Sequence, residues 1–323
     1  MLQDNFGRKF EYLRLSITDA CNFRCNYCLP DGYDCLGERD YMSLSEIQTL
    51  VSAFAQLGTK KVRITGGEPA LRKDLTDIIA LCANTPGIEQ VALTTNGFNL
   101  EKKIEQWLNA GLTNLNVSAD SLDPRMFETI TGSSKLENIL AGITKAQALG
   151  FDKIKLNAVL LKQFNLSMFD DYLAWLRDNA ITVRFIELME TGSNQLYFQQ
   201  NHVSGSILKQ QLLDQGWSQV IRDKLAGPAQ EFYHAEYAGK IGLIMPYSND
   251  FCQTCNRLRV SSHGQLHLCL FTEQGIDLRS SLKERDIEQT KLDVIASMSN
   301  KKLSHELQQN ITGINQHFAS IGG

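Results

Sequence analysis

The feature that most constrains this chain is a run of three cysteines near its start, Cys21, Cys25 and Cys28, spaced C-x3-C-x2-C. A cubane iron–sulfur cluster normally takes four thiolates, so three leave one iron open. An open iron can bind an amino group and a carboxylate, which S-adenosylmethionine (SAM) carries together, and Tyr27 lies where an adenine could pack. The alternative is a zinc clasp, although such clasps favour CxxC pairs closed by a fourth Cys or His.

A second set of three cysteines, Cys252, Cys255 and Cys269, follows far downstream. Alone, this set is typical of a zinc site completed by His263 or His267. Beside the first set, it favours a second iron–sulfur cluster that also has an open iron.

The segment between these cysteines carries Arg257 and Arg259 on either side of Leu258. Residues two apart in an extended segment point the same way, so both guanidinium groups face one side. Guanidinium groups bind anionic oxygens in a bidentate manner, and a structural zinc site has no need of such a pair. We therefore expect an anion pocket beside the second cluster.

Composition favours an enzyme with a large core. The chain has 323 residues, 43% of them hydrophobic, and single cores stop growing at roughly 250–300 residues. We therefore expect one domain over residues 1–200 and a smaller one over residues 201–323. Cys35 and Cys82 belong to neither triad; we take both as incidental and place Cys82 in the core.

Charge and hydropathy exclude other classes of protein. A net charge of −4 argues against a broad nucleic-acid surface. The polar start lacks the apolar region of a secretory signal, and no apolar run approaches the roughly 20 residues that a membrane span needs. A reducing compartment suits thiolate-bound clusters, so we expect a cytoplasmic protein that binds neither nucleic acid nor membrane.

Strand-like and helix-like segments alternate along the first part of the chain. Strands are expected at residues 12–18, 61–65, 91–95, 114–118, 153–161 and 182–189, and helices at 44–57, 74–83, 100–110, 136–149 and 168–177. This order indicates an α/β fold, an incomplete (β/α)6 barrel with a parallel sheet. A C-terminal α+β extension would carry the second cluster. Gly58, Gly111 and Gly150 are expected to end three helices.

Several of these strands alternate apolar and polar residues, although buried parallel strands are normally apolar throughout. Leu13, Leu15 and Ile17, for example, oppose Arg14. Because helices must cover the apolar faces, the polar and basic faces point into the barrel and predict a ligand chamber there. One such strand could be a solvated edge, but four share the pattern.

Two loops support a site at the carboxyl ends of the strands, where the first triad also lies. Gly66-Gly67-Glu68-Pro69 follows the second strand. Its glycines let the backbone approach a ligand closely, and Glu68 could meet an ammonium group. Residues 94–97 (TTNG) end the third strand. Each loop alone could be only a turn.

Taken together, these motifs resemble the MoaA family, the GTP 3′,8-cyclases of molybdenum-cofactor biosynthesis, which are radical-SAM enzymes. The resemblance covers nearly the whole chain. It is carried by the first triad, ITGGEP (64–69), LTTNG (93–97), NVSAD (116–120), RFIELM (184–189), the run 250–271 with the second triad, and the final Gly322-Gly323.

The resemblance implies two [4Fe-4S] clusters, with SAM cleaved at the first and guanine bound at the open iron of the second. The positions that match SAM contacts are Tyr27, Gly67, Glu68, Ser118 and Met189. The positions that match GTP contacts are Arg14, Arg63, Thr94, Lys155, Arg257, Leu258 and Arg259. The positions that match the reaction centre are Arg14, Lys61, Arg184, Gly322 and Gly323, with the diglycine end expected to reach the active site.

In that family, a 5′-deoxyadenosyl radical takes hydrogen from C3′ of GTP, and the ribose radical attacks C8 of guanine. The implied partners are GTP, an electron donor of the flavodoxin or ferredoxin type and the downstream cyclic pyranopterin monophosphate synthase (MoaC). Whether two copies form a homodimer stays open. One alternative is another radical-SAM enzyme with an auxiliary cluster, such as a peptide-maturation enzyme, where four cysteines are usual. The other is an inactive metal-binding scaffold, which would need neither GGEP nor a basic interior.

Overall fold

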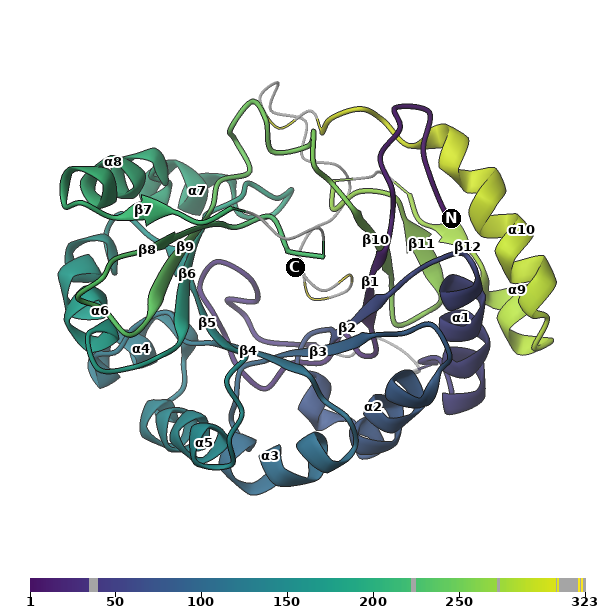
Figure 1. Ribbon diagram of the computed structural model, residues 1–323, viewed down its shortest axis with the longest axis horizontal. Helices are drawn as coiled ribbons and strands as arrows, with labels where there is room; N and C mark the ends of the chain where they lie inside the picture. The colour runs from purple at the N-terminus through teal and green to yellow at the C-terminus, as the bar shows by residue number, and fades with distance from the viewer. Residues whose placement is uncertain are drawn as a thin grey trace.

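A computed structural model describes residues 1–34, 40–221, 225–271, 274–305, 307, 319 and 321. These residues form one 12-stranded sheet that curves around an interior, with helices on its outer side (Figure 1). None of the described helices has the length and apolarity to cross a bilayer.

Parallel strands from the first part of the chain form the middle of the sheet. They are β1 (Tyr12–Ser16), β2 (Lys61–Thr65), β3 (Gln90–Thr95), β4 (Asn114–Ser118), β5 (Ile154–Leu160) and β6 (Thr182–Glu187). Each pairs in parallel with the next. The predicted incomplete (β/α)6 barrel is confirmed, although the strands expected at 12–18 and 182–189 are two residues shorter at their ends.

The helices of this part lie outside the sheet (Figure 1). They are α1 (Leu44–Gln56), α2 (Leu75–Asn84), α3 (Leu100–Asn109), α4 (Pro124–Thr131), α5 (Leu136–Ala148) and α6 (Phe169–Leu176), with short 3-10 turns η1 (Pro69–Leu71) and η2 (Leu166–Met168). Gly58, Gly111 and Gly150 follow α1, α3 and α5 with φ of +100°, +100° and +79°, as expected of glycines that end helices.

Helix α4 is absent from the sequence-based expectation. It is eight residues long, with Asp123 as its N-cap and Pro124 at its first position. The Asp123 carboxylate accepts a hydrogen bond from Met126 N at 2.8 Å, which satisfies a donor that the first turn leaves unpaired. The sequence carries this start signal in Asp123 and Pro124, although no helix was expected there.

The C-terminal part adds strands to both edges of the same sheet. On one side β10 (Arg257–Val260) pairs in parallel with β1 and is followed by β11 (Gln265–His267) and β12 (Ile276–Asp277). On the other, β9 (Lys240–Ile244) pairs in parallel with β6 and is followed by β8 (Gln230–Tyr233) and β7 (Ser218–Gln219). The predicted extension is thus present and widens the barrel wall. The boundary between 1–200 and 201–323 stays a prediction.

Helices of the C-terminal part flank these edges. They are α7 (Gln195–Asn201), α8 (Ser206–Asp214), α9 (Arg279–Lys283), α10 (Ile287–Ser297) and the 3-10 turn η3 (Met298–Asn300). Both α9 and α10 pack against α1. In the described residues the strand order runs β12-β11-β10-β1-β2-β3-β4-β5-β6-β9-β8-β7, so the sheet ends at β12 and β7 and stays open.

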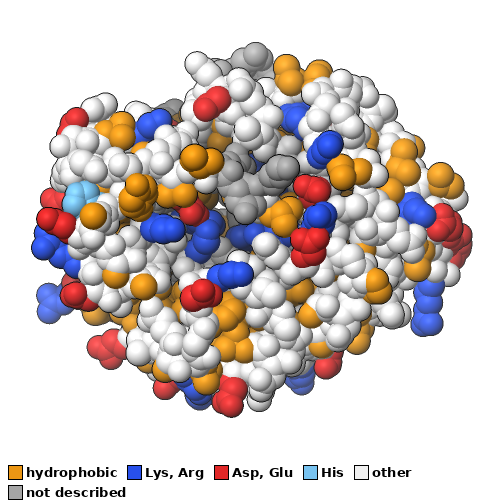
Figure 2. Space-filling model, viewed as in Figure 1, with side chains coloured by type: hydrophobic (Ala, Val, Ile, Leu, Met, Phe, Trp, Pro, Cys, Tyr) orange, Lys and Arg blue, Asp and Glu red, His pale blue; other side chains and the backbone are white. Residues whose placement is uncertain are grey.

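The two faces of the strands separate as the alternation predicts. Leu13, Leu15 and Ile17 are fully buried in the core between sheet and helices. Lys61, Arg63 and Arg184 are also nearly buried, at 7%, 7% and 4% exposure, although charged residues are rarely covered this far. Figure 2 shows Lys and Arg side chains gathered around the hollow in the middle of this face. Cys82 is buried in the core as predicted, and Cys35 lies outside the described residues.

Candidate active site

The first cysteine triad lies at the carboxyl ends of the parallel strands. Cys21, Cys25 and Cys28 line one cavity together with residues at the ends of β2 to β6, among them Gly67, Thr94, Ser118, Asn157 and Met189. The predicted SAM residues Tyr27, Gly67, Ser118 and Met189 are thus brought to the same cavity as the triad. Whether they bind SAM stays a prediction.

Helix α4, which the sequence did not reveal, holds the triad loop. Arg24 N donates to Thr131 O and Asn26 N to Ile130 O, each at 2.9 Å. Within the loop, Cys28 N donates to Cys25 O at 2.9 Å. These backbone hydrogen bonds are made within the protein, so the position of the triad loop does not depend on a ligand.

The glycines of the GGEP loop pack against the chain before Cys21, and their expected close approach to a ligand stays a prediction. A Cβ on Gly67 would lie 2.5 Å from Asp19 O and within 3.0 Å of the Ala20 carbonyl group. Gly67 N donates to Thr18 O at 2.9 Å, and Glu68 N to Ala20 O at 2.7 Å. The close approach is therefore made to the chain segment that leads into Cys21. Gly67 also lines the cavity of the first triad.

Glu68 joins the GGEP loop to the TTNG loop. Its buried carboxylate accepts hydrogen bonds from Thr95 Oγ1 at 2.7 Å, Asn96 N at 2.6 Å and Ala70 N at 2.9 Å. Burial raises the pKa of Glu68 to about 7, although the hydrogen bonds from Asn96 and Thr95 oppose this. Both oxygens are engaged within the protein, and the predicted contact with an ammonium group stays a prediction.

Asp120 positions the predicted adenine-packing residue. Tyr27 donates its hydroxyl proton to Asp120 Oδ2 at 2.9 Å, and Val159 N donates to Asp120 Oδ1 at 2.8 Å. Burial raises the pKa of Asp120 to about 6, against the effect of these two hydrogen bonds. The sequence analysis placed Asp120 in a motif but gave it no role, because its partner lies 93 residues away.

The second triad lines a cavity inside the barrel. Cys252, Cys255 and Cys269 share its wall with the basic residues Arg14, Arg63, Arg184, Arg257 and Arg259. The cavities of the two triads have four lining residues in common, Thr94, Asn157, Ile186 and Met189, so they adjoin.

Leu258 does not share the position of its two neighbours. It is 1% exposed and belongs to the apolar core, because alternate residues of β10 point to opposite sides of the sheet. Its side chain therefore lies away from the chamber, and a predicted contact with GTP would have to come from its backbone.

Strand register aligns three arginines across the chamber wall. Arg14 on β1 is the Cα partner of Arg259 on β10 and of Arg63 on β2. Burial and the neighbouring Arg259 hold the pKa of Arg14 well below its ordinary value, and burial with Arg257 lowers that of Arg259 to about 10. Like charges on neighbouring strands destabilise a sheet. An anionic ligand that lies against these three arginines would offset their mutual repulsion.

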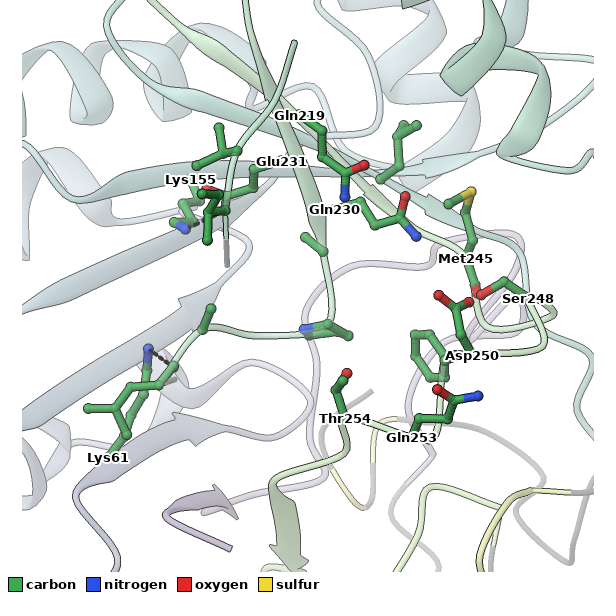
Figure 3. A pocket seen from close by; sticks show the side chains of 18 of the residues that line it. Lys61, Lys155, Gln219, Gln230, Glu231, Met245, Ser248, Asp250, Gln253 and Thr254 are labelled. Atoms are coloured by element: carbon green, nitrogen blue, oxygen red, sulfur yellow. Dashed lines mark hydrogen bonds and ion pairs between the residues drawn. The ribbon is translucent and has the colours of Figure 1, made fainter. Parts of the chain in front are cut away.

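A third cavity holds the two lysines of the predicted site. Lys61 and Lys155, near the amino ends of β2 and β5, line it with Gln219, Gln230 and Glu231 (Figure 3). Burial lowers the pKa of each lysine to about 8. Pro228 and Phe251 line both this cavity and that of the second triad, so the two cavities adjoin.

Neither histidine considered as a zinc ligand is among the described residues that line the cavity of the second triad. His263 is exposed and lies beside Asp19 Oδ2, 3.6 Å away, with its ring against Tyr41. His267 lies on β11 opposite Arg259 and is not in the described wall of the triad's cavity. Burial and Arg259 lower its pKa to about 4.

Residues from both ends of the chain support the second triad, and the sequence analysis missed them. Arg8 donates to Cys252 O at 2.9 Å, and Lys301 donates to Leu268 O. His305 lines the cavity. Burial raises the pKa of Cys252, but hydrogen bonds from His305 lower it to about 7. These partners lie from 33 to 244 residues apart, so the pairings leave no local signal in the sequence.

The tail reaches the interior at the points that the structure describes. Ala319 lines the cavity of the first triad, and Ile321 is 1% exposed. Gly322 and Gly323 lie outside the described residues, so their predicted role is untested.

The open parallel barrel, with a three-cysteine loop at the carboxyl ends of its strands, defines a radical-SAM enzyme. Residues 15–176 match the Radical SAM superfamily, and residues 181–307 match Molybdenum Cofactor Synthesis C. The chain is 53% identical over 323 residues to the GTP 3′,8-cyclase of Shewanella denitrificans, covering 100% of this chain and 96% of that protein. It is 54% identical to that of Psychromonas ingrahamii, covering 100% and 95%. The chain belongs to the GTP 3′,8-cyclase family.

A solved structure supports the fold. Streptococcus suis SuiB, solved with S-adenosylmethionine bound, aligns with a TM-score of 0.62 at 12% identity, covering 91% of this chain and 69% of SuiB. At this identity the likeness concerns the fold alone.

Proposed function

We propose that this chain converts GTP to (8S)-3′,8-cyclo-7,8-dihydroguanosine 5′-triphosphate with SAM as the source of a radical, in the first step of molybdenum-cofactor biosynthesis. One observation carries the proposal: the cavities of the two triads share a wall, and arginines line the second. A radical formed at one triad can then reach a nucleotide held at the other. Holding the reacting atoms in contact lowers the barrier, because the entropy of bringing them together is lost on binding and not in the reaction step.

Cys21, Cys25 and Cys28 would hold the cluster that binds SAM, with the fourth iron left open. When bound, this cluster and SAM supply the radical that removes hydrogen from C3′ of the ribose. Tyr27, oriented by Asp120, would pack against the adenine. Gly67, Ser118 and Met189 would shape the rest of the SAM site.

Cys252, Cys255 and Cys269 would hold a second [4Fe-4S] cluster. These three cysteines line one cavity, and three thiolates are the donor set of a cubane that keeps one iron open.

The basic chamber would bind the nucleotide. Guanine would meet the open iron of the second cluster, and the triphosphate would lie against the cations. The cations are those of Arg14, Lys61, Arg63, Lys155, Arg184, Arg257 and Arg259, and Thr94 adds a hydroxyl group. A triphosphate needs several charge-assisted hydrogen bonds, and guanidinium groups supply them in pairs.

The proposal also includes an electron donor, a downstream enzyme and a role for the C-terminal glycines. An external donor of the flavodoxin or ferredoxin type would reduce the first cluster in the cytoplasm. The product would pass to cyclic pyranopterin monophosphate synthase (MoaC). Gly322 and Gly323 would enter the chamber behind Ala319, where glycines leave room beside the substrate. Homodimer formation stays open.

Nucleotide binding tests the proposed substrate. Equilibrium binding of GTP and ATP is compared on protein that carries both clusters, with SAM present. GTP is expected to bind more tightly, because the open iron reads the guanine edge. Equal affinities for the two nucleotides would contradict the guanine assignment.

Iron content tests the proposed clusters. Reconstituted protein is expected to hold roughly eight irons per chain, four in each cluster. A variant with Cys252, Cys255 and Cys269 all changed to Ala is expected to lose about half of the iron and to keep SAM binding. Tightly bound zinc at the second triad, with only about four irons per chain, would contradict the proposal.

A further inference from the structure

Glu231 places a carboxylate among the cations of the chamber. Its Oε1 accepts from Lys155 Nζ at 2.8 Å and from Arg184 NH2 at 3.1 Å. Figure 3 shows Glu231 and Lys155 next to each other in the wall of the cavity. The sequence analysis did not single it out, because β8 joins the sheet far from β5 and β6 in the sequence.

The register of three strands makes this contact possible. Glu231 on β8 is the Cα partner of Gly242 on β9, and Gly242 is the partner of Arg184 on β6. A Cβ on Gly242 would lie 2.9 Å from Arg184 Cγ. Since Gly242 has no side chain, Arg184 crosses β9 and meets the carboxylate on the next strand.

The Glu231 carboxylate is charged, and its two partners, Lys155 and Arg184, are cations that can also bind phosphate. Burial raises the pKa of Glu231, but Lys155 and Arg184 hold it below its ordinary value. Arg184 is nearly buried, whereas Glu231 is about one-quarter exposed, with a side-chain exposure of 24% against 5%. Of these two residues, Glu231 is therefore the one with room to move aside, while Lys155, at 25% side-chain exposure, is as open as Glu231.

We propose that Glu231 is a displaceable counter-anion, which pairs with Lys155 and Arg184 in the free protein and releases them to the polyphosphate of the substrate. The identity of that anion rests on the proposed function. Buried cations without a partner are costly, so Glu231 keeps the free chamber stable. Glu231 also limits which anions can bind, because a ligand must replace both of its ion pairs. A polyphosphate can do this with several oxygens, whereas a single phosphate or chloride forms fewer contacts.

Glu231→Gln tests this directly. The variant keeps the size of the side chain and removes the charge that competes with the ligand. GTP and tripolyphosphate are each titrated by calorimetry into cluster-loaded protein with SAM. Both are expected to bind about 10-fold tighter than to the wild type, which corresponds to about 1.4 kcal/mol. Unchanged or weaker binding of tripolyphosphate overturns the proposal.

Glu236→Gln is the matched control, because Glu236 is exposed and lies outside the chamber. It removes the same charge and is expected to leave both affinities unchanged. An equal gain in Glu236→Gln would mean that overall charge, and not Glu231, decides binding, and would also overturn the proposal.

A stability measurement keeps the test valid if the variant folds poorly. Glu231→Gln leaves Lys155 and Arg184 without their carboxylate, so its unfolding midpoint is expected to fall. At the same concentration, tripolyphosphate should then raise that midpoint by more than it raises the wild type's, since stabilisation by a ligand grows with the logarithm of its concentration over Kd. An equal or smaller rise overturns the proposal. Wild-type protein that binds tripolyphosphate but not GTP would instead refute the proposed function and leave this inference standing.

Discussion

Replacing Gly67 by alanine tests how the first triad is positioned. The added Cβ would lie 2.5 Å from Asp19 O and 2.6 Å from the carbonyl carbon of Ala20. Both contacts are with backbone, which cannot rotate away as a flexible side chain can. Either the segment that leads directly into Cys21 must therefore shift, or the GGEP loop must move away from that segment.

Overpacking of this kind costs roughly 1–3 kcal/mol. We expect Gly67→Ala to lower the free energy of unfolding by that amount, measured by chemical denaturation. After reconstitution we also expect iron to fall toward roughly half, because only the first cluster is disturbed. Gly192→Ala is the control, since nothing lies within 4 Å of a Cβ there. A Gly67→Ala protein with the stability and iron content of the control would refute the reasoning.

Three further predictions concern the chamber and the tail. Burial lowers the pKa of Lys61 and Lys155 to about 8, so both lose charge as pH rises through 8. GTP affinity measured by calorimetry should therefore be full near pH 7 and fall by pH 9, and a flat profile would contradict this. Arg257→Gln should weaken GTP binding by roughly 1.5–3 kcal/mol per charged hydrogen bond lost and leave SAM affinity unchanged; loss of both would indicate unfolding. Deleting Gly322 and Gly323 should leave iron content and GTP affinity largely intact while product formation collapses, and an unchanged yield would show that the tail is not needed.

The barrel interior could be predicted because it follows a local rule. Leu13, Leu15 and Ile17 alternate with Arg14, and a two-residue period needs no knowledge of the partner strand. The place of the first triad followed as well, since a loop after a parallel strand must lie at the carboxyl end of the sheet.

Long-range contacts could not be predicted in this way. Glu231 meets Arg184 only because β8, β9 and β6 are neighbours and Gly242 leaves a gap between them. Arg8 reaches Cys252 from a position 244 residues away. The role of Gly67 was also hidden, because the segment it packs against is set by the register of β1 and β2, which no local pattern encodes.

The central claim is that a radical formed at the first triad acts on GTP held at the second. Reduced, cluster-loaded protein is incubated anaerobically with SAM and GTP, and 5′-deoxyadenosine and nucleotides are quantified by liquid chromatography with mass spectrometry. The account predicts 5′-deoxyadenosine and 3′,8-cyclised nucleotide in equal amounts, with neither accumulating when ATP replaces GTP. Two results together would contradict this claim: 5′-deoxyadenosine forms equally fast without GTP, and no cyclised nucleotide forms when GTP is present.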